Sequence, residues 1–510
     1  MNEPGSLGMH IEILTPAQPA AREWLRKPRH QLLINGQWVD PAGGQYLPTI
    51  NPATGEVLAQ IAAADAGDVD RAVAAARQAF DDGAWRNMVP AARARLLWRI
   101  ADLIDAHIDE LSELETLDQG KALYVGRWAE IPMAAEQFRF FAGMCTKVSG
   151  DTIPSSINYQ PAGKRIQAYT TKEPVGVVAA ITPWNSPLIM HAMKLAPALA
   201  AGCTVVLKPA EETSLTALRL AELLVEAGVP AGVVNVVTGL GSVVGAALSA
   251  HKQVDKVAFT GSTQTGRAIL DGAKGNLKKV TLELGGKSPV VIMPDADLDA
   301  AIAGAANAIF FNGGQVCVAG SRLYVHRSIF DKVVGGMADI ARTIRLGHGL
   351  SPDTQMGPLV SKRQADRVKA YIDQAVADGA TLVCGGGQKG PAGTFIEPTI
   401  ITGADPKSAI VCEEVFGPVV VVAPFDDVAE VVAAANDTEF GLAASVWTQD
   451  LSAASRLSAD IRAGTVWVNC HSFWDVALPI GGFKQSGWGR ESGVGAIENY
   501  LEVKTVCMVV

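Results

Sequence analysis

Apolar and polar positions follow two different rhythms along this chain of 510 residues. In the first third, apolar residues recur every three or four positions, a spacing that predicts amphipathic helices. We expect these helices from about residue 68, over 95–104 and over 129–143. Before them, residues 32–39 alternate around Asn35-Gly36, a pair that favours a tight turn. The region therefore predicts a β-hairpin followed by helices.

Four continuous apolar runs come next, and a helical segment follows each of them: 175–181, 204–208, 233–237 and 256–260. Their spacing is that of βαβ units, and their unbroken apolarity predicts a parallel sheet buried on both faces. A dinucleotide-binding domain is the usual function of such a sheet, with ligands at the carboxyl ends of the strands. The helix after the second run is expected to be capped by Thr213 or Ser214 and to end at Gly228.

The alternation of strands and helices restarts after Lys287. A helix is expected over 298–311, and the strands of a second α/β domain are expected at 288–293, 323–325, 419–422, 444–447 and 465–468. The chain is too long for one hydrophobic core, and two or three domains are expected.

Residues 151–172 interrupt this pattern with a polar, partly alternating stretch. It could be a flexible loop, but the alternation favours an interface arm, and the apolar tail over 501–510 is its candidate partner. Arm and tail together predict an oligomer, a homodimer or homotetramer. The expected domain limits are 1–30 for a loose leader, 31–150 with 173–284 for the cofactor-binding domain, 285–486 for the catalytic domain, and 151–172 with 487–510 for the arm and tail.

Composition excludes several classes of function. The net charge of −9 argues against nucleic acid as a partner. Seven scattered cysteines without C-x-x-C spacing, and eight histidines without H-E-x-x-H, indicate a reducing compartment and no metal site. No apolar run approaches the roughly 20 residues that a membrane span needs, and the first residues resemble neither a signal nor a transit peptide. We therefore expect a soluble, cytoplasmic protein without a membrane partner.

Cys317 is the candidate nucleophile. It follows a glycine pair and lies between Val316 and Val318. A lone cysteine between valines more often serves only in packing. Glu283 and Asn185 favour a catalytic role for Cys317. A thiolate, a carboxylate base and an amide donor together suit nucleophilic catalysis at a carbonyl.

Two glycine-rich turns predict a phosphate site. Gly261, Ser262 and Thr265 lie between a strand and a helix, where backbone N–H groups and hydroxyls can bind an anion. Gly241 and Gly245 repeat the arrangement one βα unit earlier. Neither turn is G-x-G-x-x-G, so a plain strand–turn–helix is the alternative, but two consecutive turns favour a dinucleotide.

Lys208 and Glu211 end the second predicted strand. An acidic residue there can hold ribose hydroxyls, and its charge would disfavour a 2′-phosphate and so favour NAD over NADP. A surface ion pair between the two side chains fits the spacing equally well, and both readings stay open.

Seven motifs occur in a shared order: Thr182-Pro-Trp-Asn185, Lys208-Pro-Ala-Glu211, Phe259-Thr-Gly-Ser262, Leu282-Glu-Leu-Gly-Gly-Lys287, Gly314-Gln-Val-Cys317, Glu413-Glu-Val-Phe-Gly-Pro418 and Pro479-Ile-Gly-Gly-Phe-Lys-Gln-Ser-Gly487. In this order the chain resembles the aldehyde dehydrogenase superfamily from about residue 30 to 505. The resemblance implies the α/β class, with a Rossmann-like dinucleotide-binding domain, an α/β catalytic domain and a β-rich oligomerisation arm. It also implies an NAD(P)-dependent oxidoreductase that turns an aldehyde into a carboxylic acid.

The resemblance assigns roles to individual residues. Cys317 would attack the aldehyde, and the Asn185 amide with the Cys317 backbone N–H would hold the oxyanion, at about 3–4 kcal/mol for each donor. Glu283 would activate the water that hydrolyses the thioester, which favours release of a free acid rather than transfer to coenzyme A. Lys194 would relay protons, although an ordinary helix-surface lysine is the alternative. Cofactor contacts would come from Trp184, Glu414 at the nicotinamide ribose, and Phe416 near that ring.

The resemblance also places a substrate pocket. Ser186 stands where many relatives carry phenylalanine, which would widen the aldehyde tunnel. The remaining pocket positions are apolar or aromatic: Met190, Met193, Val316, Val318, Phe473, Trp474 and Ile480. His471 follows Asn469-Cys470, as in phenylacetaldehyde-type enzymes. An aromatic or medium-length apolar aldehyde is the favoured substrate, and a semialdehyde or small aldehyde is the alternative.

Two other classes of protein are alternatives to this enzyme class. A non-catalytic, structural relative would have no reason to keep Cys317, Glu283 and Asn185 together. A cysteine-dependent acyl hydrolase would need a histidine base, and the nearest in sequence, His326, follows a strand that should carry it away.

Overall fold

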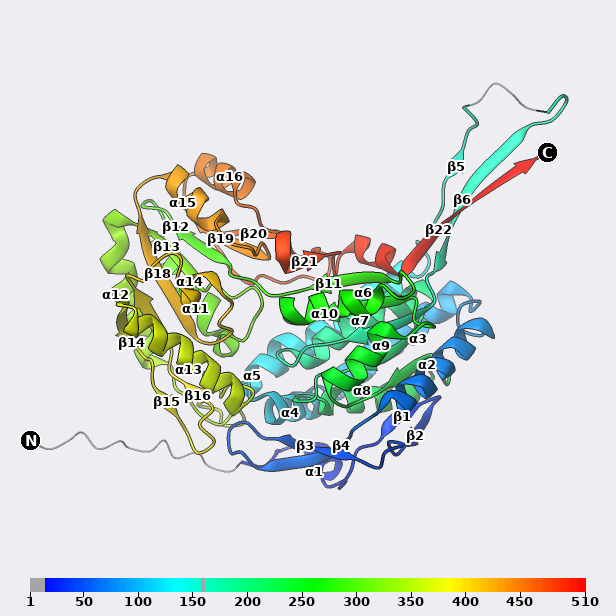
Figure 1. Cartoon of the computed structure of the whole chain (residues 1–510), viewed down its shortest axis with the longest axis horizontal. Coiled ribbons are helices and arrows are strands. Elements are labelled where there is room, and N and C mark those ends of the chain that lie inside the picture. The colour runs from blue at the N-terminus through cyan, green and yellow to red at the C-terminus, as the bar shows by residue number, and fades with distance from the viewer. Residues whose placement is uncertain (1–13, 157–160) are drawn as a thin grey trace, which may run out of the picture.

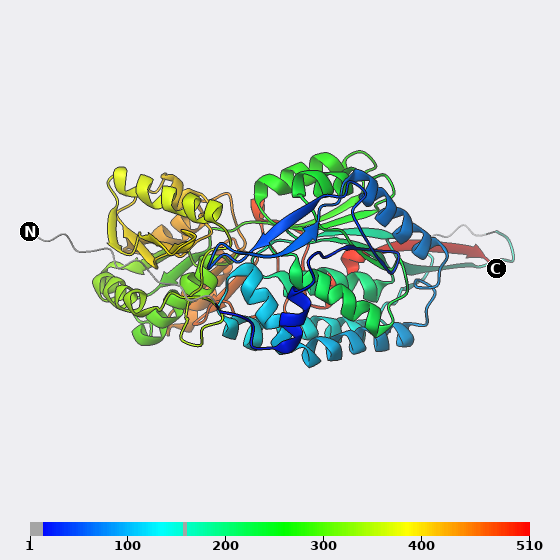
Figure 2. The same ribbon diagram turned by 90° about the horizontal axis from the view of Figure 1, so that it is seen from below.

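Two sheet-based lobes and a projecting β-ribbon make up the protein in the computed structural model, which describes residues 14–156 and 161–510 (Figure 1). The lobes lie side by side, and the ribbon leaves the larger lobe at its far end. Helices cover the strands of the larger lobe from both sides (Figure 2). The α/β class expected from the sequence is confirmed.

The larger lobe contains an eight-stranded sheet of order β2-β1-β9-β8-β7-β10-β11-β21. Strands β7 to β11 are mutually parallel, while β1 and β21 join their neighbours antiparallel. The strands are β1 Leu32–Ile34, β2 Gln37–Val39, β7 Val177–Ile181, β8 Thr204–Lys208, β9 Val234–Val236, β10 Lys256–Thr260, β11 Lys279–Glu283 and β21 Gly487–Trp488. The expected hairpin and all four apolar runs are confirmed as strands of this sheet.

Side chains of the central strands alternate between two hydrophobic cores. Val178 and Ala180 face one core, whereas Val177 and Ala179 face the other. Both cores are closed by helices, which explains why these runs are apolar at every position. The helices of this lobe are α1 Pro19–Leu25, α2 Ala66–Asp81, α3 Pro90–Ala106, α4 Ile108–Gln119, α5 Leu123–Val125, η1 Gly126–Glu130, α6 Ile131–Met144, α7 Pro187–Ala201, α8 Leu215–Ala227, η2 Gly241–Gly245, α9 Ala246–Ala250 and α10 Thr263–Ala273.

The smaller lobe contains a seven-stranded sheet of order β14-β17-β18-β13-β12-β19-β20, parallel except for β14. The second α/β unit expected after Lys287 is confirmed. Its strands are β12 Pro289–Ile292, β13 Arg322–His326, β14 Thr381–Cys384, β17 Thr399–Thr402, β18 Val419–Phe425, β19 Ala443–Trp447 and β20 Thr465–Val468. Its helices are α11 Leu298–Phe310, η3 Phe311–Gly314, η4 Arg327–Ile329, α12 Phe330–Thr343, α13 Lys362–Ala377, α14 Ala409–Cys412, α15 Val428–Asn436 and α16 Leu451–Asp460.

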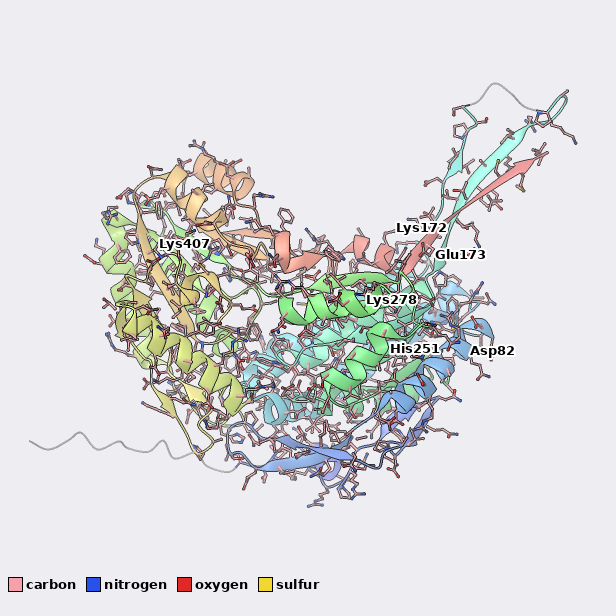
Figure 3. All side chains as sticks on the ribbon, viewed as in Figure 1. Asp82, Lys172, Glu173, His251, Lys278 and Lys407 are labelled. Atoms are coloured by element: carbon pink, nitrogen blue, oxygen red, sulfur yellow. The ribbon has the colours of Figure 1, made fainter. Side chains whose placement is uncertain are left out.

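The projecting ribbon is a three-stranded sheet of order β22-β6-β5, formed by β5 Thr152–Ile153, β6 Ile166–Pro174 and β22 Leu501–Val509. The tail pairs antiparallel with the arm along the whole length of β22, as expected from the sequence. Lys172 and Glu173 mark the base of the ribbon (Figure 3). Residues 157–160 of the expected arm lie outside the described residues. The remaining elements are β3 Tyr46–Ile50, β4 Val57–Ala62, β15 Gln388–Lys389, β16 Phe395–Ile396, η5 Lys484–Ser486 and η6 Val494–Tyr500.

Two local expectations were wrong. The leader expected to be loose contains helix α1, whose Trp24 is buried and donates its indole N–H to Glu222 Oε2 at 3.1 Å; residues 1–13 of that leader lie outside the described residues. Helix α8 begins after Ser214, but the Ser214 hydroxyl donates to the Ala210 carbonyl. Asp118 instead accepts the Leu215 N–H at 2.8 Å, so a distant side chain caps the helix.

Within residues 14–156 and 161–510, no helix is long and apolar enough to cross a membrane. None of their clusters of histidine, cysteine and acidic side chains could hold a metal ion.

Candidate active site

The loop that carries Cys317 begins where α11 ends. Asn312, Gly313 and Gly314 have φ values of 48°, 61° and 69°, so three successive residues turn in the left-handed region. A Cβ on Gly314 would lie 2.0 Å from the Gly417 carbonyl oxygen, so only glycine fits there. The glycine pair noted in the sequence therefore lets the chain turn tightly beneath the candidate nucleophile.

Gln315 fixes this loop from inside. Its Oε1 accepts the Val360 N–H at 2.9 Å, and its Nε2 donates to the Asn312 carbonyl at 3.0 Å. Its own carbonyl accepts the side-chain amide of Asn185 at 3.0 Å, while the Asn312 amide donates to the Asn185 carbonyl at 3.1 Å. Asn185 is thereby joined to the loop of Cys317 in both directions, as an oxyanion donor would need to be. An amide nitrogen carries two N–H donors, and only one is used by Gln315.

Cys317 is partly exposed and has acidic neighbours. Burial, followed by the charges of Glu414 and Glu283, raises the pKa of the Cys317 thiol to about 12, although the backbone N–H groups of Val318 and Cys317 act to lower it. The sulfur is therefore a protonated thiol at neutral pH in this state.

Glu283 ends strand β11 and is paired with Thr260 of β10. Its side chain is buried, and neither carboxylate oxygen has a hydrogen-bond partner among the described residues. Burial and the Glu491 carboxylate raise the pKa of Glu283 well above its ordinary value, against the opposing charges of Lys194 and Arg490. An unpartnered acid of this kind is a candidate general base.

Lys194 is completely buried on α7. Its ammonium forms an ion pair with Glu491 and donates to the Thr260 hydroxyl at 2.7 Å. The alternative of an ordinary helix-surface lysine is wrong. Thr260 is the strand neighbour of Glu283, so the ion pair lies near the candidate base without a hydrogen bond to it. Glu491 was missed because nothing in its local sequence distinguishes it from a surface acid.

A cavity of about 470 Å³ runs from Cys317 along the carboxyl ends of the strands. Candidate catalytic, cofactor and substrate residues from separate motifs meet on its wall: Trp184, Asn185, Met190, Lys208, Glu211, Gly241, Gly261, Ser262, Thr265, Cys317, Glu414 and Phe416. Gly245 ends η2, the short helix that Gly241 begins, and is not among the residues that line this cavity.

The predicted phosphate turns have the expected local geometry. Ser262 is the N-cap of α10 and accepts the Thr265 N–H at 3.1 Å, so the strand–turn–helix opens on the cavity. Gly241 starts η2 and donates its N–H to Glu211 Oε1 at 3.3 Å. Helix N-termini, hydroxyls and glycines around one long cavity fit a dinucleotide.

Lys208 and Glu211 form an ion pair at 2.8 Å. Partial burial raises the pKa of Glu211, but the Lys208 charge and hydrogen bond outweigh it, so the net pKa is lowered and the carboxylate stays ionised. The ion-pair alternative is thus present, and it leaves the carboxylate on the cavity wall, where a ribose could meet it.

Glu414 stands opposite Gly285 and Gly286. The Gly286 N–H donates to Glu414 Oε1 at 3.0 Å, and a Cβ on Gly285 would lie 2.3 Å from Oε2. Burial raises the pKa of Glu414 to about 7. Phe416, with a φ of 60°, packs edge-on against Trp184 at 5.2 Å between ring centroids.

Helix α13 contributes three cavity residues that sequence reasoning missed. Gln364 donates to the Phe416 carbonyl at 2.9 Å, Arg367 donates to the Glu414 carbonyl at 2.9 Å, and Arg363 pairs with Glu212 across the cavity at 2.7 Å. The signal was their helical spacing, which places 363, 364 and 367 on one face of α13.

Comparison with known proteins agrees with this geometry. The sequence profile of the aldehyde dehydrogenase family matches residues 38–506. The chain belongs to the aldehyde dehydrogenase family.

Individual relatives of this family cover nearly the whole chain. Phenylacetaldehyde dehydrogenase of Pseudomonas fluorescens is 51% identical over 488 residues, which span 95% of this chain and 97% of that protein. Aldehyde dehydrogenase family 2 member B4, mitochondrial, of Arabidopsis thaliana is 48% identical over 477 residues, 93% of this chain and 87% of that protein. A solved aldehyde dehydrogenase from Bacillus cereus, described as an NAD+ complex, superposes with a TM-score of 0.94 at 47% identity, covering 98% of this chain and 99% of that chain.

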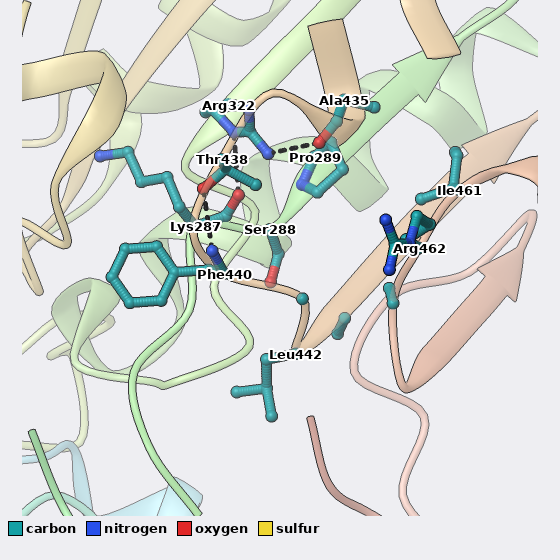
Figure 4. Close-up of a pocket in the computed structure, with 13 residues that line it drawn as sticks. Lys287, Ser288, Pro289, Arg322, Ala435, Thr438, Phe440, Leu442, Ile461 and Arg462 are labelled. Atoms are coloured by element: carbon teal, nitrogen blue, oxygen red, sulfur yellow. Dashed lines mark hydrogen bonds between the residues drawn. The ribbon is translucent and has the colours of Figure 1, made fainter. Parts of the chain in front are cut away.

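The family motif around Lys287 has a structural role. Arg322 donates to the Lys287 carbonyl at 2.8 Å and to the Ala435 carbonyl at 2.9 Å (Figure 4). Burial and the Arg322 charge lower the pKa of Lys287 to about 7. Arg322 therefore joins the strand after Cys317 to the motif after Glu283, and each of its three guanidinium nitrogens donates to a group within the protein.

The pocket residues implied by the family resemblance fall into separate places. Val318, Phe473, Trp474 and Ile480 line a second, small cavity together with Trp467. Val316 packs among apolar side chains beside Cys317, and Met193, a residue of α7, is buried in the core of the larger lobe. Ser186, where many relatives carry phenylalanine, donates its hydroxyl to Glu130 Oε1 at 2.9 Å. Glu130 is buried and also pairs with Lys121, so Ser186 is held by a buried carboxyl.

Proposed function

We propose that this protein oxidises an aromatic or medium-length apolar aldehyde to its carboxylic acid with NAD as the acceptor. The observation that carries the proposal is the junction of Asn185 with the Cys317 loop through Gln315, at the inner end of a cavity that the phosphate-type turns also line. Glu283, buried and unpartnered, completes the set of groups that this chemistry requires.

Each step can be assigned to a residue of the chain. The Cys317 thiol gives its proton to water in the cavity, its sulfur forms a bond to the carbonyl carbon, and the electron pair of the broken C–O π bond makes the carbonyl oxygen an oxyanion. The Asn185 amide and the Cys317 backbone N–H donate to that oxygen, at about 3–4 kcal/mol for each donor. NAD, whose nicotinamide Trp184, Glu414 and Phe416 would surround, would supply the acceptor for the hydride of the same carbon, and Cys317 would then hold the acyl group as a thioester.

Hydrolysis of the thioester falls to Glu283. It takes a proton from water as the water oxygen attacks the thioester carbon, and the Cys317 sulfur leaves. The buried pair of Lys194 and Glu491, which reaches Thr260 beside Glu283, is suited to pass that proton onward. General-base catalysis of this kind contributes about 10²–10⁴-fold to the rate.

The residues of the cavity suit NAD. Gly261, Ser262 and Thr265 would hold the pyrophosphate at the N-terminus of α10, with Gly241 and Gly245 at the neighbouring turn. Glu211, held ionised by Lys208, would accept from ribose hydroxyls and repel a 2′-phosphate. Glu414, Phe416 and Trp184 would surround the nicotinamide riboside. The similarity to the Bacillus cereus protein described as an NAD+ complex supports this choice.

The aromatic substrate rests on the small cavity beside Val318. Phe473 and Trp474 line it with Ile480, and no arginine borders it that could bind a substrate carboxylate or phosphate. The 51% identity to a phenylacetaldehyde dehydrogenase supports the same class of substrate.

A homodimer or homotetramer follows from the ribbon. Its outer residues are exposed in the single chain, including Ile153 and Val503, at 43% and 63%. Apolar side chains on a projecting β-sheet need a partner surface, and a second copy of the chain would supply it.

The test is reduced-nicotinamide absorbance with acetaldehyde, longer aliphatic and aromatic aldehydes and semialdehydes, each with NAD and with NADP. Turnover on aromatic or longer apolar aldehydes with NAD is expected. Preference for a semialdehyde or a small aldehyde would refute the substrate class inferred from Phe473 and Trp474. Preference for NADP would refute the cofactor choice inferred from Glu211. Either result would leave the class of reaction standing. Absence of turnover across the panel would favour a non-catalytic relative.

A further inference from the structure

His471 contacts the loop of the nucleophile directly. The ring is buried, with Nε2 at 2.9 Å from the Val318 carbonyl oxygen and Nδ1 at 2.9 Å from the Ser445 hydroxyl. Val318 is the residue after Cys317, and Ser445 lies in the middle of β19. One imidazole therefore joins the nucleophile loop to the central part of the smaller lobe's sheet.

The bonding partners fix which nitrogen carries the proton. A carbonyl oxygen only accepts, so Nε2 of His471 donates to Val318 and Nδ1 accepts from the Ser445 hydroxyl. Burial lowers the pKa of His471 to about 4, so the ring is neutral at physiological pH. It is a fixed neutral bridge, and neither nitrogen is left to act as a base.

The segment that carries His471 is itself held in an uncommon conformation. Asn469 and Ser472 have φ values of 54° and 57°, in the left-handed region that non-glycine residues seldom adopt. The Asn469 amide and backbone anchor this turn to β19, through the Thr448 carbonyl at 2.9 Å and the Val446 carbonyl at 2.9 Å. Strained turns of this kind persist where the surrounding structure requires a side chain in one place.

The conformation of Val318 matters because Val318 directly follows Cys317, and its N–H belongs to the peptide group that the two residues share. The backbone N–H groups of Val318 and Cys317 are the groups that act to lower the pKa of the Cys317 thiol, against Glu414 and Glu283, which raise it. The carbonyl of Val318 is directed at His471, so the bridge restrains rotation of the same residue. On its other side Val318 lines the small apolar cavity with Phe473 and Trp474.

We propose that His471 is a positioning residue that holds Val318 in place, so that the Val318 and Cys317 N–H groups stay directed at the reacting sulfur. The inference rests on the proposed role of Cys317 as nucleophile. His471 acts only through Val318 and touches neither substrate nor sulfur.

The first measurement is the rate of Cys317 alkylation by iodoacetamide between pH 6 and 10, followed by peptide mass and without aldehyde or cofactor. In His471→Ala the alkylation profile is expected to move to higher pH by about half a unit or more, because the Val318 N–H loses its fixed direction. In turnover, kcat is expected to fall about tenfold or more, with a smaller change in KM. His471 stays neutral across this range, so its own titration does not enter.

Two variants separate positioning from general destabilisation. His471→Gln keeps an N–H donor that can reach Val318 and is expected to restore most of the profile and of kcat. His348→Ala removes a second buried neutral histidine, held by Asn51 at 3.2 Å and by the Leu350 N–H at 3.1 Å, and should leave the Cys317 profile unchanged. If His471→Ala does not fold, His471→Asn, whose shorter amide reaches Ser445 but not Val318, makes the same comparison.

A folded His471→Ala or His471→Asn variant with the wild-type profile and kcat would overturn the proposal. So would a His471→Gln variant as impaired as the alanine variant, or an equal shift in His348→Ala. Because the alkylation profile needs no aldehyde, a shifted profile in a protein that oxidises no aldehyde would refute the proposed function and leave the role of His471 standing.

Discussion

Replacing Glu283 with glutamine tests the proposed base with little structural disturbance. The Glu283 side chain is buried, and its two oxygens have no hydrogen-bond partner among the described residues, so glutamine breaks no ion pair and changes little volume. The variant loses only the ability to take a proton. A general base contributes about 10²–10⁴-fold, so thioester hydrolysis is expected to slow by that factor while formation of the thioester continues.

The pH dependence gives a second, independent signature. Burial and Glu491 raise the pKa of Glu283 well above its ordinary value, so the carboxyl is protonated below that raised pKa and becomes a base above it. Below the pKa, each fall of one pH unit lowers the ionised fraction of Glu283 about tenfold. Deacylation of the wild-type protein is therefore expected to rise with pH through this range, and that rise is expected to vanish in Glu283→Gln.

The assay is rapid mixing of aldehyde with protein and NAD, with reduced nicotinamide and intact mass recorded together. Glu283→Gln is expected to give a burst of one reduced nicotinamide per active site and a mass increase of one acyl group. Glu113→Gln is the matched control, a buried glutamate that accepts the N–H groups of Ala17 and Gln18 far from the cavity. Slow turnover of Glu283→Gln without burst or adduct would refute the role of the base.

Four further measurements address other parts of the molecule. Cys317→Ala is expected to abolish turnover while cofactor binding, measured by calorimetry, remains; residual turnover would remove Cys317 as nucleophile. Gly314→Ala is expected to destabilise the fold by about 1–3 kcal/mol or more, because φ is 69° and the new Cβ would lie 2.0 Å from the Gly417 oxygen; an unchanged unfolding midpoint would contradict this. Alkylation of Cys317 without cofactor is expected to be slow at neutral pH and to rise with pH toward the thiol pKa of about 12, and a flat profile would contradict a protonated resting thiol. Removal of residues 501–510 is expected to lower the mass measured by light scattering, and an unchanged oligomer would exclude the ribbon as the interface.

Much of the fold could be predicted because its strands are apolar at every position. Runs such as 204–208 and 256–260 are buried on both faces, and they are therefore composed largely of apolar residues. Strand β11 is harder to predict, because its Lys279 and Thr281 interrupt the apolar pattern near the sheet's edge. Periodicity detects burial on two faces better than it detects pairing.

The residues of the candidate site also differ in how far the sequence predicts them. Cys317, Glu283 and Asn185 stand in local motifs, and the structure joins Asn185 to the loop of Cys317. Glu491 and Asp118 could not be found, because their roles depend on partners about 300 and 100 residues away, at Lys194 and Leu215. Contacts between distant parts of the chain leave no trace in local spacing.

Burial acts in the same direction on the candidate nucleophile and on two carboxyl groups near it. Cys317 and Glu414 line the cavity, and Glu283 is close enough for its charge to act on the thiol. Each of the three groups has its pKa raised, the thiol to about 12 and Glu414 to about 7. Burial is the main cause for all three, and the acids add to it by raising the pKa of the thiol. Ionising any one of them makes the next ionisation harder, because like charges repel strongly where water is scarce. A positive charge brought into the cavity would therefore lower the pKa of both Cys317 and Glu414, which line it.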